Sequence, residues 1–500
     1  MRLTINGQPV EVPAGSSVAA ALAAAAIPAR RSVLGEARGP LCAMGICFEC
    51  RVTINGQPHQ RSCQIQALAG MTIGVSPPPA AAEPRRPLST VHCPLSTSLL
   101  VLGAGPAGLA AAARAAEAGA QVALIDDNPA LGGQIWRGTT TDPHSEAARW
   151  AQRVQAAQVT VLCATRIVDA PAPGRLLAES PDGPLELGYQ RLLLATGARE
   201  RFLPFPGWTL PHVLGAGGLQ ALVKAGLPIE GKRVVVAGTG PLLLAVAAYL
   251  RQHGAQVVAV CDQASWSALL AFSARLPLDK IRQGLQLSAS LRGVPLWRNA
   301  WPLSTRPGAV TISHRGRARE LACDYLACGF HLVPNAELAT LLGCATQDGC
   351  VVVNPSQETT VAGVYCAGEP TGVGGVELAV AEGEIAGLAM ANQTPEPALL
   401  ARRAYYRRFA RRLDRLCQLR PALRALPQPD TLVCRCEDVT LGRLRAHDSW
   451  RAAKLHTRCG MGPCQGRVCG PAAEFLFGWQ PDSLRPPIFP ANIATLSGQE

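Results

Sequence analysis

"LLVLGAGPAGLAAAARAAEAGAQVALID", from Leu99 to Asp126, places a glycine-rich turn between a short aliphatic strand and a helix, and ends in a second strand. Short aliphatic segments continue to alternate with helical ones as far as residue 392, among them RLLLATG, RVVVAGTG, QVVAVCD and GVYCAG. Such alternation is typical of α/β proteins built on parallel sheets. The sequence therefore predicts the α/β class, with a doubly wound core over residues 98–395.

The glycines of this stretch follow the dinucleotide-binding fingerprint. Gly103 makes the tight turn, Gly105 admits a pyrophosphate and Gly108 lets the helix approach the strand. The phosphates then lie at the helix N-terminus, and a carboxylate at the end of the second strand binds ribose hydroxyls. The predicted cofactor-binding residues of this stretch are Gly103, Gly105, Pro106, Ala107, Gly108, Asp126 and Asp127.

Three further stretches indicate which dinucleotide is bound: LGGQI (131–135), LLLATGARE (192–200) and GVYCAGEP (363–370). They follow the order and spacing of two-dinucleotide-domain flavoproteins, which they resemble. In that family the last stretch contacts the flavin ribityl chain, usually through Asp, where this chain has Glu369. The resemblance predicts bound FAD. It adds the cofactor-binding residues Gly133, Gln134, Ala195, Thr196, Gly197, Gly368 and Glu369.

A second dinucleotide domain is expected as an insertion at about 205–335, and contains VVVAGTGPLLLAVAAYLRQHGAQVVAVCD (234–262). This stretch keeps Gly238 and Gly240 but has Leu243 for the third glycine, which would push the helix away from the strand. Asp262 is placed to bind a ribose. Two interpretations stay open, a site for NAD(P) or another adenine nucleotide, and a vestigial fold. No C-x-x-C or C-x4-C pair lies beside the flavin motifs, which disfavours disulfide reduction.

Four cysteines stand close together in GPLCAMGICFECRVTINGQPHQRSC, from Gly39 to Cys63. A C-x4-C-x2-C loop wraps one face of a two-iron cluster through thiolates. Gly45 lets the backbone pass close to inorganic sulfide. Zinc is the alternative, but zinc sites usually pair C-x2-C knuckles. We therefore predict a [2Fe–2S] cluster with the metal ligands Cys42, Cys47, Cys50 and Cys63.

The segments around this loop predict a small β-grasp domain. TINGQP occurs at Thr4–Pro9 and again at Thr53–Pro58, and each copy is an alternating strand that runs into Asn-Gly, a strong hairpin signal. An Ala-rich helix is expected between them at Ser16–Ala26. The domain should cover residues 1–78, and a proline-rich linker should follow at 79–97.

A second group of cysteines lies near the C-terminus, where LVCRCEDVT and TRCGMGPCQGRVCGP offer five thiols for four ligand places. The arrangement resembles the bacterioferritin-associated ferredoxin type of [2Fe–2S] domain, expected at 428–480 before a tail at 481–500. A related GMGxCQGxxC element favours Cys464 and Cys469 over Cys459, so that the resemblance implies the ligands Cys434, Cys436, Cys464 and Cys469. The spacing does not exclude Cys459, and zinc is the alternative metal.

The composition favours a globular redox protein over a membrane or nucleic-acid-binding one. No apolar run reaches the roughly 18 residues that a membrane helix needs, and the N-terminus lacks signal-peptide features, so a cytoplasmic location is expected. The net charge of +12 comes almost wholly from arginine, most densely in ARRAYYRRFARRLDRL (401–416). We interpret this part of a connector at 396–427 as an amphipathic helix with Tyr405, Phe409 and Leu413 on one face. Nothing else in the chain resembles a nucleic-acid module.

The three parts together resemble the A/B components of bacterial heteromeric amine dehydrogenases, which include hydrogen cyanide synthase, opine oxidase, D-hydroxyproline dehydrogenase and the α subunit of heterotetrameric sarcosine oxidase. The resemblance implies that a partner of D-amino-acid-oxidase type oxidises the C–N bond of an amino acid, imino acid or opine. This chain would then pass the electrons through FAD and two [2Fe–2S] clusters to a quinone or carrier protein. An FMN at a subunit interface and peripheral attachment at the inner face of the plasma membrane are compatible with the resemblance.

No substrate-oxidising residues can be named from the sequence. His144, His212, His253 and His331 are scattered without a neighbouring acid or nucleophile pattern, so each is interpreted as structural. Two other functions stay open: a self-contained NAD(P)H-dependent ferredoxin-type reductase that uses the Gly238 site, and a non-enzymatic redox carrier or sensor.

Overall fold

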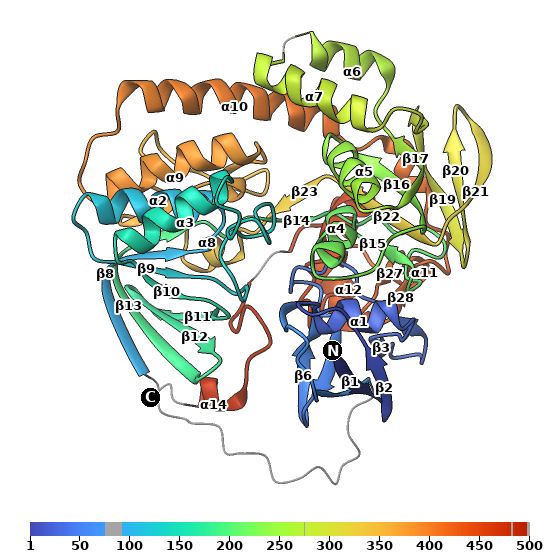
Figure 1. Cartoon of the computed structure of the whole chain (residues 1–500), viewed down its shortest axis with the longest axis horizontal. Helices are drawn as coiled ribbons and strands as arrows, with labels where there is room; N and C mark the ends of the chain where they lie inside the picture. The colour runs from blue at the N-terminus through green and yellow to red at the C-terminus, as the bar shows by residue number, and fades with distance from the viewer. Residues whose placement is uncertain (76–92, 275, 482–483, 498–500) are drawn as a thin grey trace. The chain divides into compact units, whose positions relative to one another are not determined.

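Figure 1 shows the computed structural model of the chain, which describes residues 1–75, 93–274, 276–481 and 484–497. The chain forms two compact units, each made of segments that are far apart in the sequence. Unit 1 is built from the described residues of Met1–Arg85, Glu200–Leu332 and Leu413–Asp482, and unit 2 from those of Arg86–Arg199, Val333–Arg412 and Ser483–Glu500. Most of the linker expected at 79–97 lies outside the described residues.

Unit 1 begins with a mixed sheet in the order β2-β1-β7-β5-β6. Its strands are β1 (Arg2–Ile5), β2 (Gln8–Glu11), β5 (Arg51–Ile54), β6 (Gln57–Arg61) and β7 (Thr72–Gly74). Both TINGQP hairpins form as antiparallel pairs, with Asn6 and Asn55 in the left-handed conformation that this turn requires. Helix α1 (Val18–Ala24) starts at the N-cap Ser17 and buries Val18 and Leu22 in the core of this sheet.

The middle segment of unit 1 forms a parallel sheet in the order β15-β22-β16-β17-β18. Its buried strands read as continuous aliphatic runs, as expected for a sheet covered on both faces. The strands are β15 (Val213–Leu214), β16 (Arg233–Thr239), β17 (Gln256–Asp262), β18 (Leu296–Arg298) and β22 (Tyr325–Phe330). The helices are α4 (Ala216–Lys224), α5 (Leu242–Gln252), α6 (Trp266–Ser273) and α7 (Leu278–Ser290), and an antiparallel sheet contains β19 (Ala300–Arg306), β20 (Ala309–His314) and β21 (Arg317–Ala322).

The last segment of unit 1 carries the C-terminal cysteines on short elements. These are β27 (Leu432–Cys434), β28 (Val439–Thr440), α11 (Leu441–Leu444), α12 (Trp450–Thr457) and α13 (Cys469–Phe477). One hydrophobic core takes side chains from all three segments of the unit, including Leu41, Val235 and Val433. Both cysteine groups therefore belong to the same packed body.

Unit 2 is built on a seven-stranded sheet in the order β10-β9-β8-β13-β12-β11, with β26 also beside β13. The strands are β8 (Cys93–Leu102), β9 (Val122–Ile125), β10 (Thr160–Leu162), β11 (Arg166–Ala172), β12 (Arg175–Ser180), β13 (Gly183–Leu194) and β26 (Val364–Cys366). The strands that carry the motifs, β8, β9, β13 and β26, pair in parallel, which confirms the predicted α/β class. Strand β8 begins before the core boundary expected at residue 98, because the long β13 pairs with it from Leu185.

Helices α2 (Pro106–Glu117) and α9 (Val376–Met390) pack against each other in unit 2. Gly383 and Gly387 permit this contact, because a Cβ on them would lie 2.1 Å and 2.3 Å from the carbonyl oxygens of Ala107 and Ala111. The unit also contains α3 (Glu146–Ala156), α8 (Glu337–Leu341), β24 (Thr346–Gln347), β25 (Cys350–Val351), η2 (Glu369–Thr371) and α14 (Ile493–Leu496). The tail expected at 481–500 returns to this sheet, where the Ile488 amide donates to the carbonyl of Val168.

The arginine-rich stretch lies in one long helix, α10 (Pro397–Cys417), as predicted. The face expected for it needs a correction, because Phe409 is buried but Tyr405 is 41% exposed. Arg403 and Arg407 instead turn inward and pair with the buried Glu382 of α9. Within the described part of the chain, no helix is both long and apolar enough to cross a membrane.

Candidate functional site

The glycine loop that follows β8 has one glycine open to a ligand. A Cβ on Gly103, where φ is +105°, would lie 2.2 Å from the carbonyl oxygen of Ala195. One on Gly108 would lie 1.7 Å from the carbonyl oxygen of Gly103. Both glycines are therefore required by packing. A Cβ on Gly105 meets only the Cα of Gly133, at 4.0 Å, so the space beside the N-terminus of α2 is open there.

The other predicted flavin motifs converge on this loop. The Gly132 amide donates to the carbonyl of Ala104 at 2.8 Å, and a Cβ on Gly133 would lie 3.0 Å from the Cα of Gly105. A Cβ on Gly368 would lie 3.0 Å from that of Ala107. Thr196 and Gly197 follow Ala195, the first residue after β13, whose amide donates to the carbonyl of Leu102 in β8. The structure thus places the three predicted flavin stretches around the glycine loop that follows β8.

Asp126 has a structural task at this point. Its carboxylate accepts hydrogen bonds from the backbone amides of Ala104, at 2.5 Å, and Asn128, at 2.7 Å. Burial raises the pKa of Asp126. Asp127 pairs with Arg166 at 3.1 Å instead. Contact of either carboxylate with a ribose stays a prediction.

Two polar atoms are buried near the loop without a hydrogen-bond partner among the described residues, Oε2 of Glu369 and Oε1 of Gln134. The other oxygen of Glu369 accepts from the Gly375 amide at 3.1 Å, and burial raises the pKa of this carboxyl to about 7. Buried polar atoms normally have partners, so these two fit the hydroxyls and polar edges of a bound flavin nucleotide. These two unpartnered atoms and the open space at Gly105 show that the residues of this site fit a bound FAD.

Glu382 is a residue of this site that the sequence analysis did not single out. Its fully buried side chain accepts from the Gly368 amide at 3.0 Å, from Oγ1 of Thr371 at 2.8 Å and from Nε of Arg407 at 2.8 Å. It thereby fixes the turn that carries Glu369. A carboxylate inside the apolar helix that follows GVYCAGEP was the available signal.

The first cysteine loop buries its four predicted ligands in unit 1. The Sγ atoms of Cys42 and Cys47 lie 3.1 Å apart, and Cys50 is hydrogen-bonded to Cys63. The hydrogen bond with Cys47 lowers the pKa of Cys42, and that with Cys63 lowers the pKa of Cys50. The backbone amides of Met44 and Cys47 point at the sulfur of Cys42, both at 3.4 Å. Convergent buried thiols with amide donors to sulfur fit a [2Fe–2S] cluster.

The second cysteine group brings all five of its thiols together. The Sγ atoms of Cys434, Cys459 and Cys469 all lie within 4.8 Å of one another, and that of Cys436 lies 3.5 Å from that of Cys464. The structure therefore gathers the four predicted ligands but also includes Cys459, which spacing alone left open. The Cys459 amide is held by Oγ1 of Thr457 at 3.2 Å, beside a left-handed Arg458.

Comparison with known proteins shows what the chain is related to. Residues 97–384 match the family model "Pyridine nucleotide-disulphide oxidoreductase", and residues 1–76 match "2Fe-2S iron-sulfur cluster binding domain". An opine oxidase subunit from Rhizobium meliloti (strain 1021) is 32% identical over 451 residues, which cover 80% of this chain and 98% of that protein. The HcnB subunit of hydrogen cyanide synthase from Pseudomonas protegens is 31% identical over 431 residues, with 75% and 90% covered.

The chain belongs to the pyridine nucleotide-disulphide oxidoreductase family. Within it, the resemblance to opine oxidase and hydrogen cyanide synthase is confirmed. These matches support an oxidoreductase with FAD and an N-terminal [2Fe–2S] cluster. A solved structure titled L-proline dehydrogenase from P. horikoshii shares the fold, with a TM-score of 0.72, 19% identity, and 99% of this chain and 97% of that one covered.

In the second dinucleotide fold of this oxidoreductase, other residues of the same chain lie against the glycine turn. A Cβ on Gly240 would lie 2.8 Å from Sγ of Cys417, and a Cβ on Gly238 would lie 1.7 Å from the carbonyl oxygen of Gly329. Asp262 pairs with Arg298 at 2.7 Å in a buried contact and accepts from the Ala264 amide. The neighbouring Gln263 donates to the carbonyl of Gln418 at 2.9 Å.

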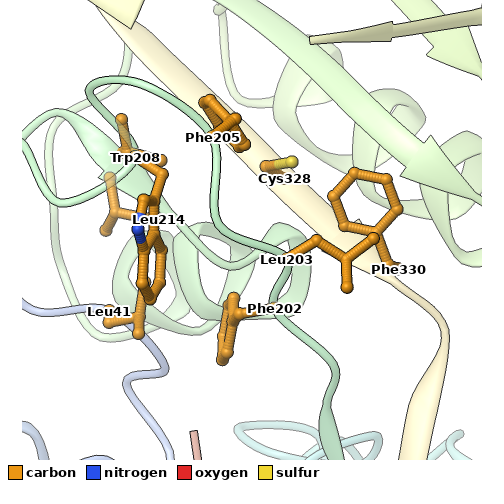
Figure 2. A pocket seen from close by; sticks show the side chains of 9 residues that line it. Leu41, Phe202, Leu203, Phe205, Trp208, Leu214, Cys328 and Phe330 are labelled. Atoms are coloured by element: carbon orange, nitrogen blue, oxygen red, sulfur yellow. The ribbon is translucent and has the colours of Figure 1, made fainter. Parts of the chain in front are cut away.

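An apolar cavity of the oxidoreductase lies beside the first cysteine loop, with Leu41 and Trp208 on one side of it (Figure 2). Its volume of about 10 Å³ is at most that of one water. This space is therefore a gap in the core rather than a substrate site. Its lining consists of Leu41, Phe202, Leu203, Phe205, Trp208, Val213, Leu214, Cys328 and Phe330.

Proposed function

We propose that the chain is the electron-transferring subunit of a heteromeric dehydrogenase that acts on an amino acid, imino acid or opine. The observation that carries the proposal is the pairing of a flavin-type site in unit 2 with two groups of buried cysteines in unit 1. The relatives support it, because two of them are named as subunits of opine oxidase and hydrogen cyanide synthase. The proposal includes the domain boundaries expected from the sequence, with the cluster domains at 1–78 and 428–480 and the flavoprotein core at 98–395.

The flavin site would hold FAD through the residues that converge on Gly105. The open turn and the N-terminus of α2 suit the pyrophosphate, and Glu369 suits the ribityl chain. FAD supplies two-electron chemistry when bound, whereas iron–sulfur clusters carry one electron at a time. The protein's own contribution is to place Glu369, through Glu382 and Thr371, with one carboxylate oxygen free for a hydroxyl donor.

The C-terminal cysteines would hold a second [2Fe–2S] cluster, with ligands drawn from Cys434, Cys436, Cys464 and Cys469. Cys459 is the alternative to one of them, because its sulfur lies in the group of three. Two clusters require about four iron and four acid-labile sulfide per chain. Metal and sulfide analysis tests this directly, since half that content or stoichiometric zinc would remove the second cluster from the proposal.

We infer that the second dinucleotide fold is vestigial. Asp262 is already neutralised by Arg298, the sulfur of Cys417 lies at the glycine turn, and the Gln418 carbonyl accepts from Gln263. This disfavours the alternative function, an NAD(P)H-dependent reductase. Addition of NADH or NADPH to the oxidised protein should leave the flavin absorbance unchanged, and rapid bleaching would favour the reductase instead.

The partner would be a D-amino-acid-oxidase-like subunit that oxidises the C–N bond, with a quinone or a carrier protein as the final acceptor. The proposal also includes an FMN at the interface between the two subunits. The complex would be cytoplasmic, and any membrane attachment would be peripheral, at the inner face of the plasma membrane. The experiment that tests it is purification of the native complex followed by identification of the co-purifying chain. Isolation of the chain as an active, partner-free amine oxidase would contradict it.

A further inference from the structure

Glu49 and Arg435 meet inside unit 1 although they lie 386 positions apart in the sequence. Each stands within one cysteine motif: Glu49 follows Cys47 by two residues, and Arg435 separates Cys434 from Cys436. Oε2 of Glu49 accepts from Nε of Arg435 at 2.9 Å, and each side chain is 1% exposed. A fully buried ion pair therefore joins the two cysteine loops directly.

A second cation completes this contact. Nη2 of Arg30 donates to Oε1 of Glu49 at 2.5 Å and to the carbonyl of Arg435 at 3.2 Å. Arg435 also donates to the carbonyls of Trp208, at 3.3 Å, and Gly39, at 3.5 Å. We call Arg30, Glu49 and Arg435 the charge bridge. It places two guanidinium groups and one carboxylate between the loops, which leaves an excess of positive charge there.

A reciprocal ion pair lies beside the charge bridge. Arg38 contacts Asp438 at 2.8 Å, and the two side chains are 0% and 1% exposed. Here the N-terminal segment supplies the base and the C-terminal segment the acid. Burying ion pairs costs desolvation that apolar side chains would avoid, so stability alone gives no reason for charges at this junction.

We propose that the charge bridge couples the two cluster sites electrostatically and favours the reduced state of both clusters. This inference rests on the second cluster of the proposed function. A [2Fe–2S] cluster held by thiolates is anionic, and it becomes more so when one Fe³⁺ accepts one electron to become Fe²⁺. Positive charge buried beside it stabilises that added electron, because buried charges are weakly screened.

Both clusters would respond to the same groups. The Glu49 amide donates to the sulfur of Cys47 at 3.5 Å, while Cys436 interacts electrostatically with both Glu49 and Arg30. An electron added at one site is therefore felt at the other through residues they share. The electron comes from the reduced flavin of the proposed function, or from dithionite in the experiment below, and no proton takes part. The charge bridge residues act by position, since none of them is a proposed ligand.

Electron paramagnetic resonance of the full chain tests the coupling. After reduction with dithionite, we expect a spectrum that is broadened or split relative to the sum of two reference spectra, because neighbouring spins interact. The references are the Cys47→Ser and Cys434→Ser variants, which should each retain one cluster. A wild-type spectrum equal to that sum would overturn the proposal, and this measurement does not require any charge-bridge variant to fold.

Redox titration tests the charge. Arg435→Gln should lower the midpoint potentials of both clusters. At a given applied potential, the ratio of reduced to oxidised cluster should fall about tenfold, which corresponds to a shift of about 59 mV for a one-electron couple. Arg435→Lys should largely restore them, and Arg445→Gln, at an exposed arginine of the same segment, should change neither. A shift confined to one cluster, or none, contradicts the inference.

Metal analysis separates this inference from the proposed function. Iron sufficient for only one cluster would refute the second cluster and with it this inference, while the flavin site and the first cluster of the proposed function would stand. Iron sufficient for both, with additive spectra and unmoved potentials, would refute the charge bridge alone.

Discussion

At the scale of single residues, three glycines of one motif have different reasons to be glycine. Gly103 and Gly108 are fixed by backbone atoms that a Cβ would overlap, whereas Gly105 faces open space. Substitution at Gly103 or Gly108 would therefore report on folding. Only Gly105 separates ligand binding from the stability of the chain.

The Gly105→Val variant should fold normally but lose FAD. Its φ of −75° suits any L-residue, while the added side chain would occupy the space that the pyrophosphate needs. We expect FAD to bind more than tenfold more weakly, a loss of about 1.4 kcal/mol or more. Flavin absorbance of the purified protein measures this, with Gly284→Ala, at an open helical glycine, as the control. Unchanged flavin content would place the cofactor elsewhere.

Glu200 should make the stability of unit 1 depend on pH. This buried carboxyl accepts from the amides of Gly217 and Gly218 at 2.9 Å and 3.1 Å, and burial raises its pKa from 4.5 to about 7. The folded state therefore favours the protonated form. The stability that this gives is fully present below pH 4.5 and is lost as the pH rises through 7.

The Glu200→Gln variant should remove this dependence. Between pH 5 and pH 8, the free energy of unfolding of the wild type should fall by up to about 3 kcal/mol more than that of the variant. Urea denaturation at the two pH values provides the measurement. Parallel losses in both proteins would mean that Glu200 is ionised throughout this range.

At the scale of elements, the contact between α9 and α10 holds the flavin motif in place. Glu382 of α9 is completely buried, and its nearest cation is Arg407 of α10, with Arg403 further away at 3.8 Å. The same carboxylate fixes the turn before η2. A change on the arginine-rich helix should therefore reach the Glu369 carboxylate.

The Arg407→Ala variant should destabilise the protein and weaken FAD binding together. Removal of the only cation of a buried pair costs about 3–5 kcal/mol, and we expect about 1–3 kcal/mol here because Arg407 is one-third exposed and Arg403 remains. Chemical denaturation and a FAD titration measure the two effects. Arg411→Ala, at an exposed position of the same helix, is the matched control and should change neither.

Elements with local signals were predicted well. The Asn-Gly turns fixed both hairpins, and Ser17 caps α1 inside the expected helix. The packed face of α10 was not predicted correctly, because the apolar pattern pointed to Tyr405 while the helix buries arginine side chains against Glu382. Ion pairs between elements leave no trace in the periodicity of one helix.

At the scale of the whole molecule, the sites likewise divide into those that have a local sequence signal and those that depend on contacts between distant residues. Glycine and cysteine motifs reveal themselves by residue type and spacing, so the flavin turn and both cysteine groups were visible in the sequence. The charge bridge and the contact between Gln263 and Gln418 join residues 386 and 155 positions apart, and nothing local marks them. Inclusion of Cys459 in its group likewise depends on the fold of the C-terminal segment.

The division into units predicts independent cofactor sites. Cys47 lies in unit 1, whereas the flavin motifs lie in unit 2. The Cys47→Ser variant should therefore lose the signal of the N-terminal cluster, with about two iron atoms fewer per chain, and keep its FAD absorbance. Visible spectroscopy and iron analysis of one preparation provide both readings. Simultaneous loss of flavin would show that the units do not fold independently.

At the scale of the whole molecule, the proposed function depends on a second polypeptide. The purified chain alone should not oxidise glycine, sarcosine, hydroxyproline or opines at a useful rate, because the proposed function assigns oxidation of the C–N bond to the partner. Addition of a D-amino-acid-oxidase-like partner should restore turnover with an artificial acceptor dye. Of the α10 arginines, Arg402, Arg403 and Arg407 already pair within unit 2, while Arg408, Arg411 and Arg415 are exposed.

If the exposed arginines contact the partner, salt should weaken the complex, since exposed charges are screened beyond about 8 Å at physiological ionic strength. Size-exclusion chromatography across salt concentrations follows assembly, and the dye assay follows activity in the same samples. The Arg408→Ala/Arg411→Ala double variant should assemble less well at low salt and show a smaller salt dependence. Arg445→Ala, in the C-terminal segment, is the control. Amine oxidation by the isolated chain at the rate of the reconstituted complex would show that this chain is the catalytic subunit.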